Sequence, residues 1–193
     1  MRIKWTTGLA VAAGLLAMAV GGATIHAAVT QSSTDVPKTI PDGPAPNTTA
    51  SVNSTLNFTV AGTITDANLT VTITHTFESD IELRLTRPGG AGVLVFGDCG
   101  GSGDNFNNTT ISDEGVAPNC GAGGGFAGTF QGAPAGVPNP TVMTAFDTFA
   151  SAGVWNLNVA DDSPADTGTL TAWSLTLDGA PPLPVELMKM EVK

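Results

Sequence analysis

The segments NLTVTITHTFESDIELRLTRPGG (residues 68–90) and GVWNLNVADDSPADTGTLTAWSLTLD (residues 153–178) decide the fold. In both segments apolar residues recur at every second position, as in Leu69, Val71 and Ile73, and only a pleated strand has that period. Each segment also contains an acidic turn, because Asp side chains satisfy backbone groups where the chain reverses. The two segments therefore predict sets of half-buried β-strands that bracket one all-β domain.

Further strands are expected outside these two segments. Residues 56–60 are predicted to form the first strand and residues 93–96 a short apolar one, and residues 141–150 are interpreted as a loop that packs Phe146 and Phe149 inward. Gly and Pro turns separate the apolar runs, and no segment of the domain shows a convincing helical pattern. The pattern predicts a β-sandwich or jelly roll of about eight antiparallel strands.

The 193 residues have room for one domain and its flanking segments. Residues 1–27 are expected to be a signal peptide, because two basic residues precede an apolar run that is too short to span a bilayer. Residues 28–36 are polar and have no periodicity, so they are expected to be a disordered lead-in. The sandwich would then span residues 37–178, and residues 179–193 would form a C-terminal tail.

Charge limits the partners of the exported chain. The sequence has 17 acidic and seven Lys or Arg residues, and two of the basic residues, Arg2 and Lys4, lie in the leader. A chain this acidic is not expected to bind nucleic acid or an anionic membrane, whereas a cation or a basic partner suits it. The LPVEL sequence of the tail (residues 183–187) resembles a linker of secreted bacterial proteins, so a bacterial protein, periplasmic or extracellular, is expected.

Cys99 and Cys120 are expected to form a disulfide, because exported proteins fold under oxidising conditions. Closing a loop of about 20 residues stabilises a fold by roughly 3 kcal/mol in the chain-entropy model. The loop needs such help, because twelve of the 24 glycines lie between residues 97 and 136 and glycine backbone is costly to order.

With these residues placed, the chain resembles the P domain, also called the P/Homo B domain, which follows the catalytic domain of kexin- and furin-like subtilisin proteases. Five residues of the resemblance are interpreted as framework: His75, Asp80, Trp155, Gly168 and Trp173. The matching motifs, in chain order, are IPD (40–42), THT (74–76), SDI (79–81), TRPG (86–89), DE (113–114), AF (145–146), GVW (153–155), DD (161–162), DTGTL (166–170) and WSL (173–175).

The resemblance implies a β-sandwich that stabilises or modulates a neighbouring protease, and in some family members it implies bound calcium. The chain departs from the family in its long glycine-rich loop with a cysteine pair, and no protease sequence precedes Ile40. We therefore expect a secreted, non-catalytic module that stabilises or binds a partner. The partner would be a subtilisin-like protease, with catalysis on another chain, or another exported protein.

Catalysis by the chain itself is not expected, and no catalytic residue is assigned. A serine hydrolase needs a Ser nucleophile, a His base and an Asp that orients the His, and His75 is the one histidine outside the leader. His75 lies on the apolar face of its strand, which favours a core residue. Asp80 could pair with His75 across a tight turn, but a carboxylate that caps backbone N–H groups is the preferred interpretation.

Calcium is the one cofactor that the sequence favours, since it takes six to eight oxygen ligands and acidic turns supply them. Aspartate is also common in turns for local reasons, so the hypothesis needs a geometric test. The candidate ligands are Asp161, Asp162 and Asp166 in one turn, and Asp98, Asp104 and Asp113 beside the glycine-rich loop.

A carbohydrate- or surface-binding sandwich is the remaining alternative. Trp155 and Trp173 could stack on sugars if they were exposed. Both tryptophans have the same phase as apolar strand neighbours, such as Leu157 and Leu175, which favours the core instead.

Overall fold

The computed structural model describes residues 28–46, 48–121 and 123–179. This part of the chain forms ten β-strands and three short 3-10 helices. Their bounds are β1 (Val29–Ser32), β2 (Lys38–Ile40), β3 (Ala50–Phe58), β4 (Asp66–His75), η1 (Glu78–Asp80), β5 (Ile81–Thr86), β6 (Gly92–Phe96), β7 (Phe106–Val116), β8 (Phe126–Phe130), η2 (Pro134–Gly136), η3 (Met143–Phe146), β9 (Gly153–Asp161) and β10 (Gly168–Asp178).

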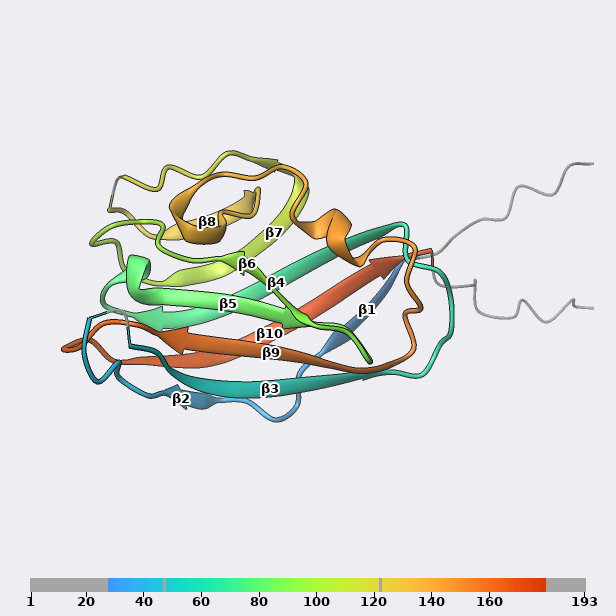
Figure 1. Cartoon of the computed structure of the whole chain (residues 1–193), viewed down its shortest axis with the longest axis horizontal. Coiled ribbons are helices and arrows are strands. Elements are labelled where there is room, and N and C mark those ends of the chain that lie inside the picture. The colour runs from blue at the N-terminus through green and yellow to red at the C-terminus, as the bar shows by residue number, and fades with distance from the viewer. Residues whose placement is uncertain (1–27, 47, 122, 180–193) are drawn as a thin grey trace, which may run out of the picture.

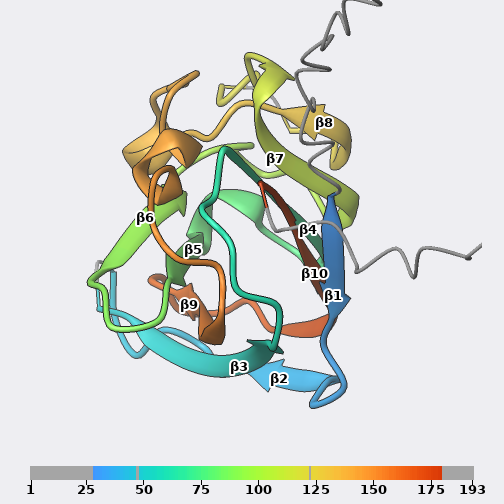
Figure 2. The ribbon, with the colours of Figure 1, turned by 90° about the vertical axis from the view of Figure 1, so that its right-hand side faces the viewer.

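The strands form two sheets that face each other (Figures 1 and 2). One sheet has the order β1-β10-β4-β7-β8, with β2 also paired to β10, and the other has the order β3-β9-β5-β6. The predicted all-β sandwich is confirmed. The described chain has ten strands rather than about eight, and β7 and β8 run parallel, because the glycine-rich loop carries the chain back beside Phe106 before β8 begins.

The core lies between the sheets and follows the alternation that the sequence predicts. Leu69, Val71 and Ile73 of β4 are fully buried. In β10 the period is interrupted by a register shift between Leu170 and Ala172, and this irregularity turns both Leu170 and Trp173 inward although three positions separate them. The bulge therefore lets one strand keep its apolar side chains in the core on both sides of the irregularity.

The prediction that residues 28–36 are disordered is wrong. Val29–Ser32 form β1, which pairs antiparallel with β10 from Leu177 to Ser174. Behind it, Asp35 accepts hydrogen bonds from Ser33 and from Lys38 Nζ (2.9 Å), as well as from Ser54 of β3. Burial opposes ionisation of Asp35, but these hydrogen bonds hold its pKa below the usual range. An edge strand held through its backbone needs little apolar periodicity, so composition did not reveal it.

The two flanking predictions lie outside the described residues: the signal peptide (1–27) and the tail beyond residue 179. In the part of the chain that is described, no helix has the length and apolar character needed to cross a membrane.

Two local expectations change. The first strand of the predicted core starts at Ala50 rather than at residue 56, because polar residues such as Ser54 occupy inward positions of β3. In the 141–150 segment Phe146 is buried as predicted, but Phe149 is 39% exposed. The Arg87 guanidinium lies 3.5 Å from the centre of the Phe149 ring, and this cation–π contact holds the ring at the surface.

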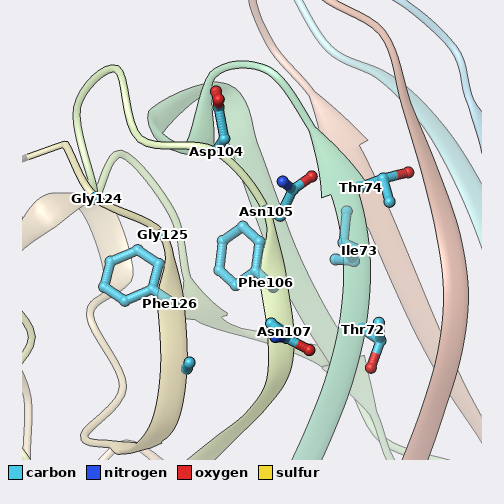
Figure 3. Close-up of a pocket in the computed structure, with 11 residues that line it drawn as sticks. Thr72, Ile73, Thr74, Asp104, Asn105, Phe106, Asn107, Gly124, Gly125 and Phe126 are labelled. Carbon is cyan, nitrogen blue, oxygen red and sulfur yellow. The ribbon is translucent and has the colours of Figure 1, made fainter.

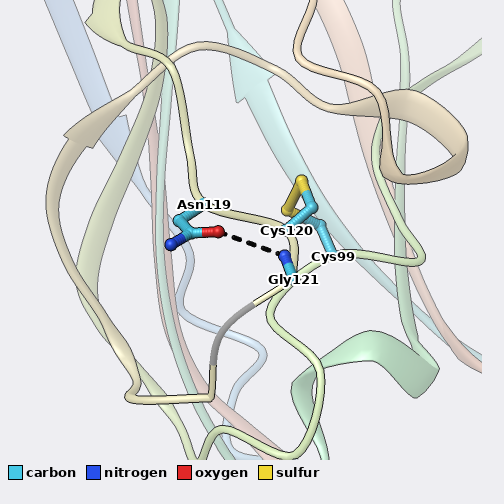
Figure 4. Close-up of a disulfide and its surroundings, with 4 residues drawn as sticks. All are labelled: Cys99, Asn119, Cys120 and Gly121. Atoms are coloured by element: carbon cyan, nitrogen blue, oxygen red, sulfur yellow. Dashed lines mark hydrogen bonds between the residues drawn. A yellow bond between two sulfur atoms is a disulfide. The ribbon is translucent and has the colours of Figure 1, made fainter.

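The predicted disulfide is confirmed between Cys99 and Cys120, whose Cα atoms are 4.1 Å apart (Figure 4). It joins Cys99, in the turn after β6, to Cys120, in the glycine-rich loop between β7 and β8. Beside it, the Gly121 backbone N–H donates to Asn119 Oδ1 (3.2 Å), so a side-chain turn and a covalent link shape the same part of the loop.

Removing the disulfide is expected to lower the free energy of unfolding by roughly 3 kcal/mol, because the link closes a loop with a sequence separation of 21 residues. Urea denaturation of the Cys99→Ser/Cys120→Ser double variant measures the change. Asn119→Ala is the control, since it removes the local hydrogen bond and leaves the covalent link. Equal unfolding free energies for the double variant and the wild type would show that the loop is ordered without the disulfide.

Candidate functional site

The six aspartates predicted as calcium ligands do not lie together. Asp161, Asp162 and Asp166 lie near Asp80 at one end of the sandwich, and Asp98 is close to Asp162. Asp104 lies beside Glu78 instead. Asp113 is elsewhere again, because its Oδ1 accepts a hydrogen bond from the Met143 backbone N–H (3.0 Å). The predicted ligand set therefore divides among three places.

His75 is a framework residue whose partner comes from the opposite sheet. Its Nε2 donates to Asp161 Oδ2 over 3.1 Å, and both side chains are fully buried. Asp161 is the last residue of β9, 86 positions along the chain. The pair thus ties β4 of one sheet to β9 of the other, and the imidazole is not available as a general base at the surface.

Gly168 has its place in this framework because β10 passes very close to His75. A Cβ atom at Gly168 would lie 2.5 Å from His75 Cδ2 and 2.6 Å from the Thr74 carbonyl oxygen. Thr76 and Asp166 lock the neighbouring turn, since the Thr76 hydroxyl donates to Asp166 Oδ1 (2.5 Å). Asp166 therefore serves the turn and is not a free carboxylate.

Both motif tryptophans are core residues. Trp155 is fully buried and donates from Nε1 to the Ser151 carbonyl (2.9 Å), and Trp173 is 2% exposed and donates to Ser54 Oγ (2.7 Å). Their rings offer no surface on which a sugar could stack. The carbohydrate alternative therefore loses the two residues on which it depended.

Asp80 does not have the role that the sequence favoured. The prediction that its carboxylate caps backbone N–H groups is wrong, because it makes no hydrogen bond to another described residue. It pairs with His75 only at long range: the charge of His75 lowers the pKa of Asp80, but burial and the charges of Asp161, Asp162 and Asp166 outweigh it and raise the pKa to about 6.

Glu78 is a residue that the sequence analysis missed. Its side chain is 1% exposed, and its carboxylate accepts a hydrogen bond from the Phe126 backbone N–H (2.8 Å), while its own backbone N–H donates to the Gly103 carbonyl (2.9 Å). A Cβ atom at Gly100 would lie 2.5 Å from Glu78 Oε2. Glu78 is thus the buried centre around which the glycine-rich loop folds, and the density of glycines before residue 126 was the signal for it.

Burial raises the pKa of Glu78 to about 7; the charge of Asp104 adds to this, and hydrogen bonds from Phe126 and Gly125 oppose it. The folded chain therefore binds a proton at Glu78 more tightly than the unfolded chain does. Above pH 7 Glu78 is ionised in the folded chain, and its burial lowers the free energy of unfolding by the full amount. As the pH falls below 7, Glu78 takes up a proton in the folded chain and the free energy of unfolding rises, until the pH reaches the ordinary range of a glutamate.

The folded chain is accordingly expected to gain on the order of 2 kcal/mol from Glu78 when the pH falls from 8 to 5. Chemical denaturation at several pH values measures it. Other carboxylates with raised pKa values, including Asp80, act in the same direction, so the matched variant is Glu78→Gln. This variant should be more stable than the wild type at pH 8 and should show a smaller gain on acidification; an unchanged pH profile would contradict the assignment.

A shallow cavity of about 410 Å³ lies beside β4, β7 and β8 (Figure 3). The rings of Phe106 and Phe126, whose centres are 5.3 Å apart, form its floor. Thr72, Thr74 and Asp104 contribute polar groups. Asp104 is the one titratable side chain in its lining, so the cavity brings together no acid–base pair.

A direct calcium site is not preformed. Among residues 28–46, 48–121 and 123–179, no group of three or more His, Cys, Asp or Glu side chains could hold a metal ion. Asp161 and Asp166 are already hydrogen-bonded to neighbours, Asp161 also accepting from the Ser163 backbone N–H (3.0 Å). The donor set therefore does not fit direct calcium ligation, and calcium binding stays a prediction.

Comparison with known proteins shows the family of this chain. The family model of the proprotein convertase P-domain matches residues 64–177. Among solved structures, the serine protease of Aeromonas sobria in complex with the chaperone is 14% identical, with a TM-score of 0.46, and the match covers 80% of this chain and 27% of that chain. Another structure of the serine protease of Aeromonas sobria is 15% identical, with a TM-score of 0.42, at 79% and 27% coverage.

The chain thus spans about a quarter of the length of those proteases, 27% in each case. No curated protein matches it. The matched segment contains six complete strands, β4 to β9, and most of β10. It includes the residues interpreted as framework: His75, Asp80, Trp155, Gly168 and Trp173. Because the match covers more than half of the sequence, the chain belongs to the proprotein convertase P-domain family.

Proposed function

We propose that this chain is a secreted, non-catalytic module that binds and stabilises a subtilisin-like protease or another exported protein. The observation that carries the proposal is the family match over residues 64–177, since the P domain accompanies the catalytic domain of such proteases. The match covers the sandwich itself, so the proposed activity is that of the sandwich surface.

The use of the polar residues supports a non-catalytic role. The His75 imidazole is fully buried against Asp161, and the carboxylate of Glu78 is enclosed by the glycine-rich loop. Either group could serve a hydrolase as its base, but each holds one part of the fold to another. Chemistry would therefore come from the partner.

We also propose that the protein is located outside the cytoplasm. The Cys99–Cys120 disulfide supports it, because disulfides persist in oxidising compartments and are rare in reducing ones. Fractionation of the producing cells measures it: the mature chain should appear in the periplasmic or culture fraction, and recovery in the cytoplasm alone would contradict it.

The stabilising role is tested by adding the purified chain to a subtilisin-like protease of the same organism. A ligand that binds only the folded protease raises its melting temperature by mass action, and at 100 times the dissociation constant the gain is about 2.7 kcal/mol. We expect an increase of several degrees and a longer half-life of proteolytic activity on heating.

The matched control is the Trp155→Ala variant at the same concentration, which removes the side chain at the centre of the core. If the intact chain and this variant leave the protease equally stable, and calorimetry detects no binding, the protease is not the partner of this chain.

A further inference from the structure

Asp80, Asp98 and Asp162 line one polar cavity of about 300 Å³, together with Pro46, Ser79 and Ser163. We call it the Asp80 cavity. Its carboxylates come from three places in the chain: η1, the turn after β6 and the turn after β9. The fold therefore gathers at one end of the sandwich three negative charges that the sequence separates.

Asp80 is buried in this cavity without a partner. It is 9% exposed and lines the cavity wall, yet its carboxylate oxygens accept no hydrogen bond from any described residue. Its oxygens are not fully enclosed, since Asn68 Oδ1 is the one such unpartnered side-chain atom among the described residues, but their hydration through the cavity is incomplete and that is costly. The raised pKa of Asp80 has the same origin, burial first and then the nearby charges of Asp161, Asp162 and Asp166.

The other two carboxylates are also unused by the fold. The side chains of Asp98 and Asp162 make no hydrogen bond to another described side chain or backbone group outside their own residue, in contrast to Asp161 and Asp166, which have donors. Their negative charges also act on a neighbouring acidic residue. After burial, Asp162 and Asp98 are what raise the pKa of Glu82 on the adjacent strand β5.

The described chain supplies no positive charge to compensate. Its three Lys and Arg residues are engaged elsewhere: Lys38 pairs with Asp35, Arg84 donates to the Gly92 carbonyl (3.3 Å), and Arg87 stacks on Phe149. His75, the nearest imidazole, is already paired with Asp161. None of the described basic side chains is therefore available to the cavity, which suits a cation from a partner.

We propose that the Asp80 cavity receives an arginine side chain of the partner protein. The three carboxylates do not form a group that could hold a metal ion directly, whereas a guanidinium is broad, presents five donors in a planar fork and can bridge separated carboxylates. Its long stem can reach the largely buried Asp80 from the surface. The cavity volume accommodates such a head group with water around it.

That the arginine belongs to a partner protein rests on the proposed role as a binding module. The preference of the Asp80 cavity for a positively charged group is a property of this chain alone and can be measured on it. The probe is Nα-acetyl-L-arginine amide, titrated into the full isotope-labelled chain at constant ionic strength while amide NMR shifts are recorded. Nα-acetyl-L-citrulline amide, which has nearly the same shape and no charge, is the matched control ligand.

We expect saturable shifts at Asp80, Asp98, Asp162 and Ser163 with the arginine derivative, half-complete at roughly millimolar concentration, and none with the citrulline derivative. Asp80→Asn should weaken the response at least tenfold. Asp178→Asn makes the same change in charge at the other end of β10 and should leave it unchanged.

Three results would overturn the inference: no saturable shift at these residues, an equal loss of response in Asp178→Asn, or shifts at these residues with calcium chloride and not with the arginine derivative. The last would make the cavity a metal site. If a protease binds the chain but the arginine derivative does not, only this inference is wrong. If the arginine derivative binds but no protease does, only the protease role is wrong.

Discussion

Replacing His75 with alanine is expected to lower the free energy of unfolding by roughly 3–5 kcal/mol. The substitution leaves the carboxylate of Asp161 fully buried without the imidazole that lies 3.1 Å away. Removing one member of a buried pair costs more than the pair contributes, and the Asp161 carboxylate would keep only the Ser163 backbone N–H as a donor. The cost also falls on both sheets at once, because the pair joins β4 to β9.

Urea denaturation monitored by tryptophan fluorescence measures this change. Thr74→Ala is the control, since Thr74 is the preceding residue of β4 and is exposed on the opposite face. A loss below 1 kcal/mol for His75→Ala would show that Asp161 finds water or another donor, and the cross-sheet pair would not then be part of the framework.

The second large effect is expected for Trp155→Ala, which should cost about 3–5 kcal/mol. The indole is fully buried between Phe146 and Phe58, with ring centres 5.5 Å and 6.3 Å away. Its Nε1 also satisfies the Ser151 carbonyl. Truncation therefore opens a large cavity and leaves a buried acceptor without its donor.

Thermal and chemical unfolding of Trp155→Ala and Trp155→Phe measure this effect together. The phenylalanine variant keeps most of the ring contacts and loses the hydrogen bond, so it should cost less than the alanine variant. If Trp155→Ala instead kept wild-type stability and lost retention on an insoluble polysaccharide, Trp155 would be a ligand-binding residue and the carbohydrate alternative would return.

The fold could be predicted from the sequence wherever one face of a strand is dry. The alternation of Leu69, Val71 and Ile73 reports strand geometry directly, and the structure confirms it. β1 escaped prediction because it is held by backbone hydrogen bonds to β10 and by the Asp35 network rather than by a buried face. The parallel pairing of β8 depends on the path of the glycine-rich loop, which has no period to read.

The arrangement of the acids could be predicted only in part. The burial of His75 against a carboxylate is in line with the framework role that the sequence suggested. The sequence placed Asp161, Asp162 and Asp166 in one turn, but it did not predict that this turn lies near Asp80. The partner of His75 could not be chosen correctly, because Asp80 is five positions away in the chain and Asp161 is 86 positions away, and the pairing is decided by how β9 packs on β4. Local spacing also could not show that Asp98 and Asp162 share a cavity wall.

Active-site labelling tests most directly whether this P-domain chain binds a protease without being one. The producing organism's exported proteins are treated with a fluorescent fluorophosphonate, which labels active serine hydrolases, and are passed over the immobilised chain with and without excess soluble chain. We predict that a labelled subtilisin-like protease is retained, that the soluble chain displaces it, and that the chain itself takes no label. Label on the chain would contradict its non-catalytic role, and retention of no labelled protease would contradict a protease as its partner.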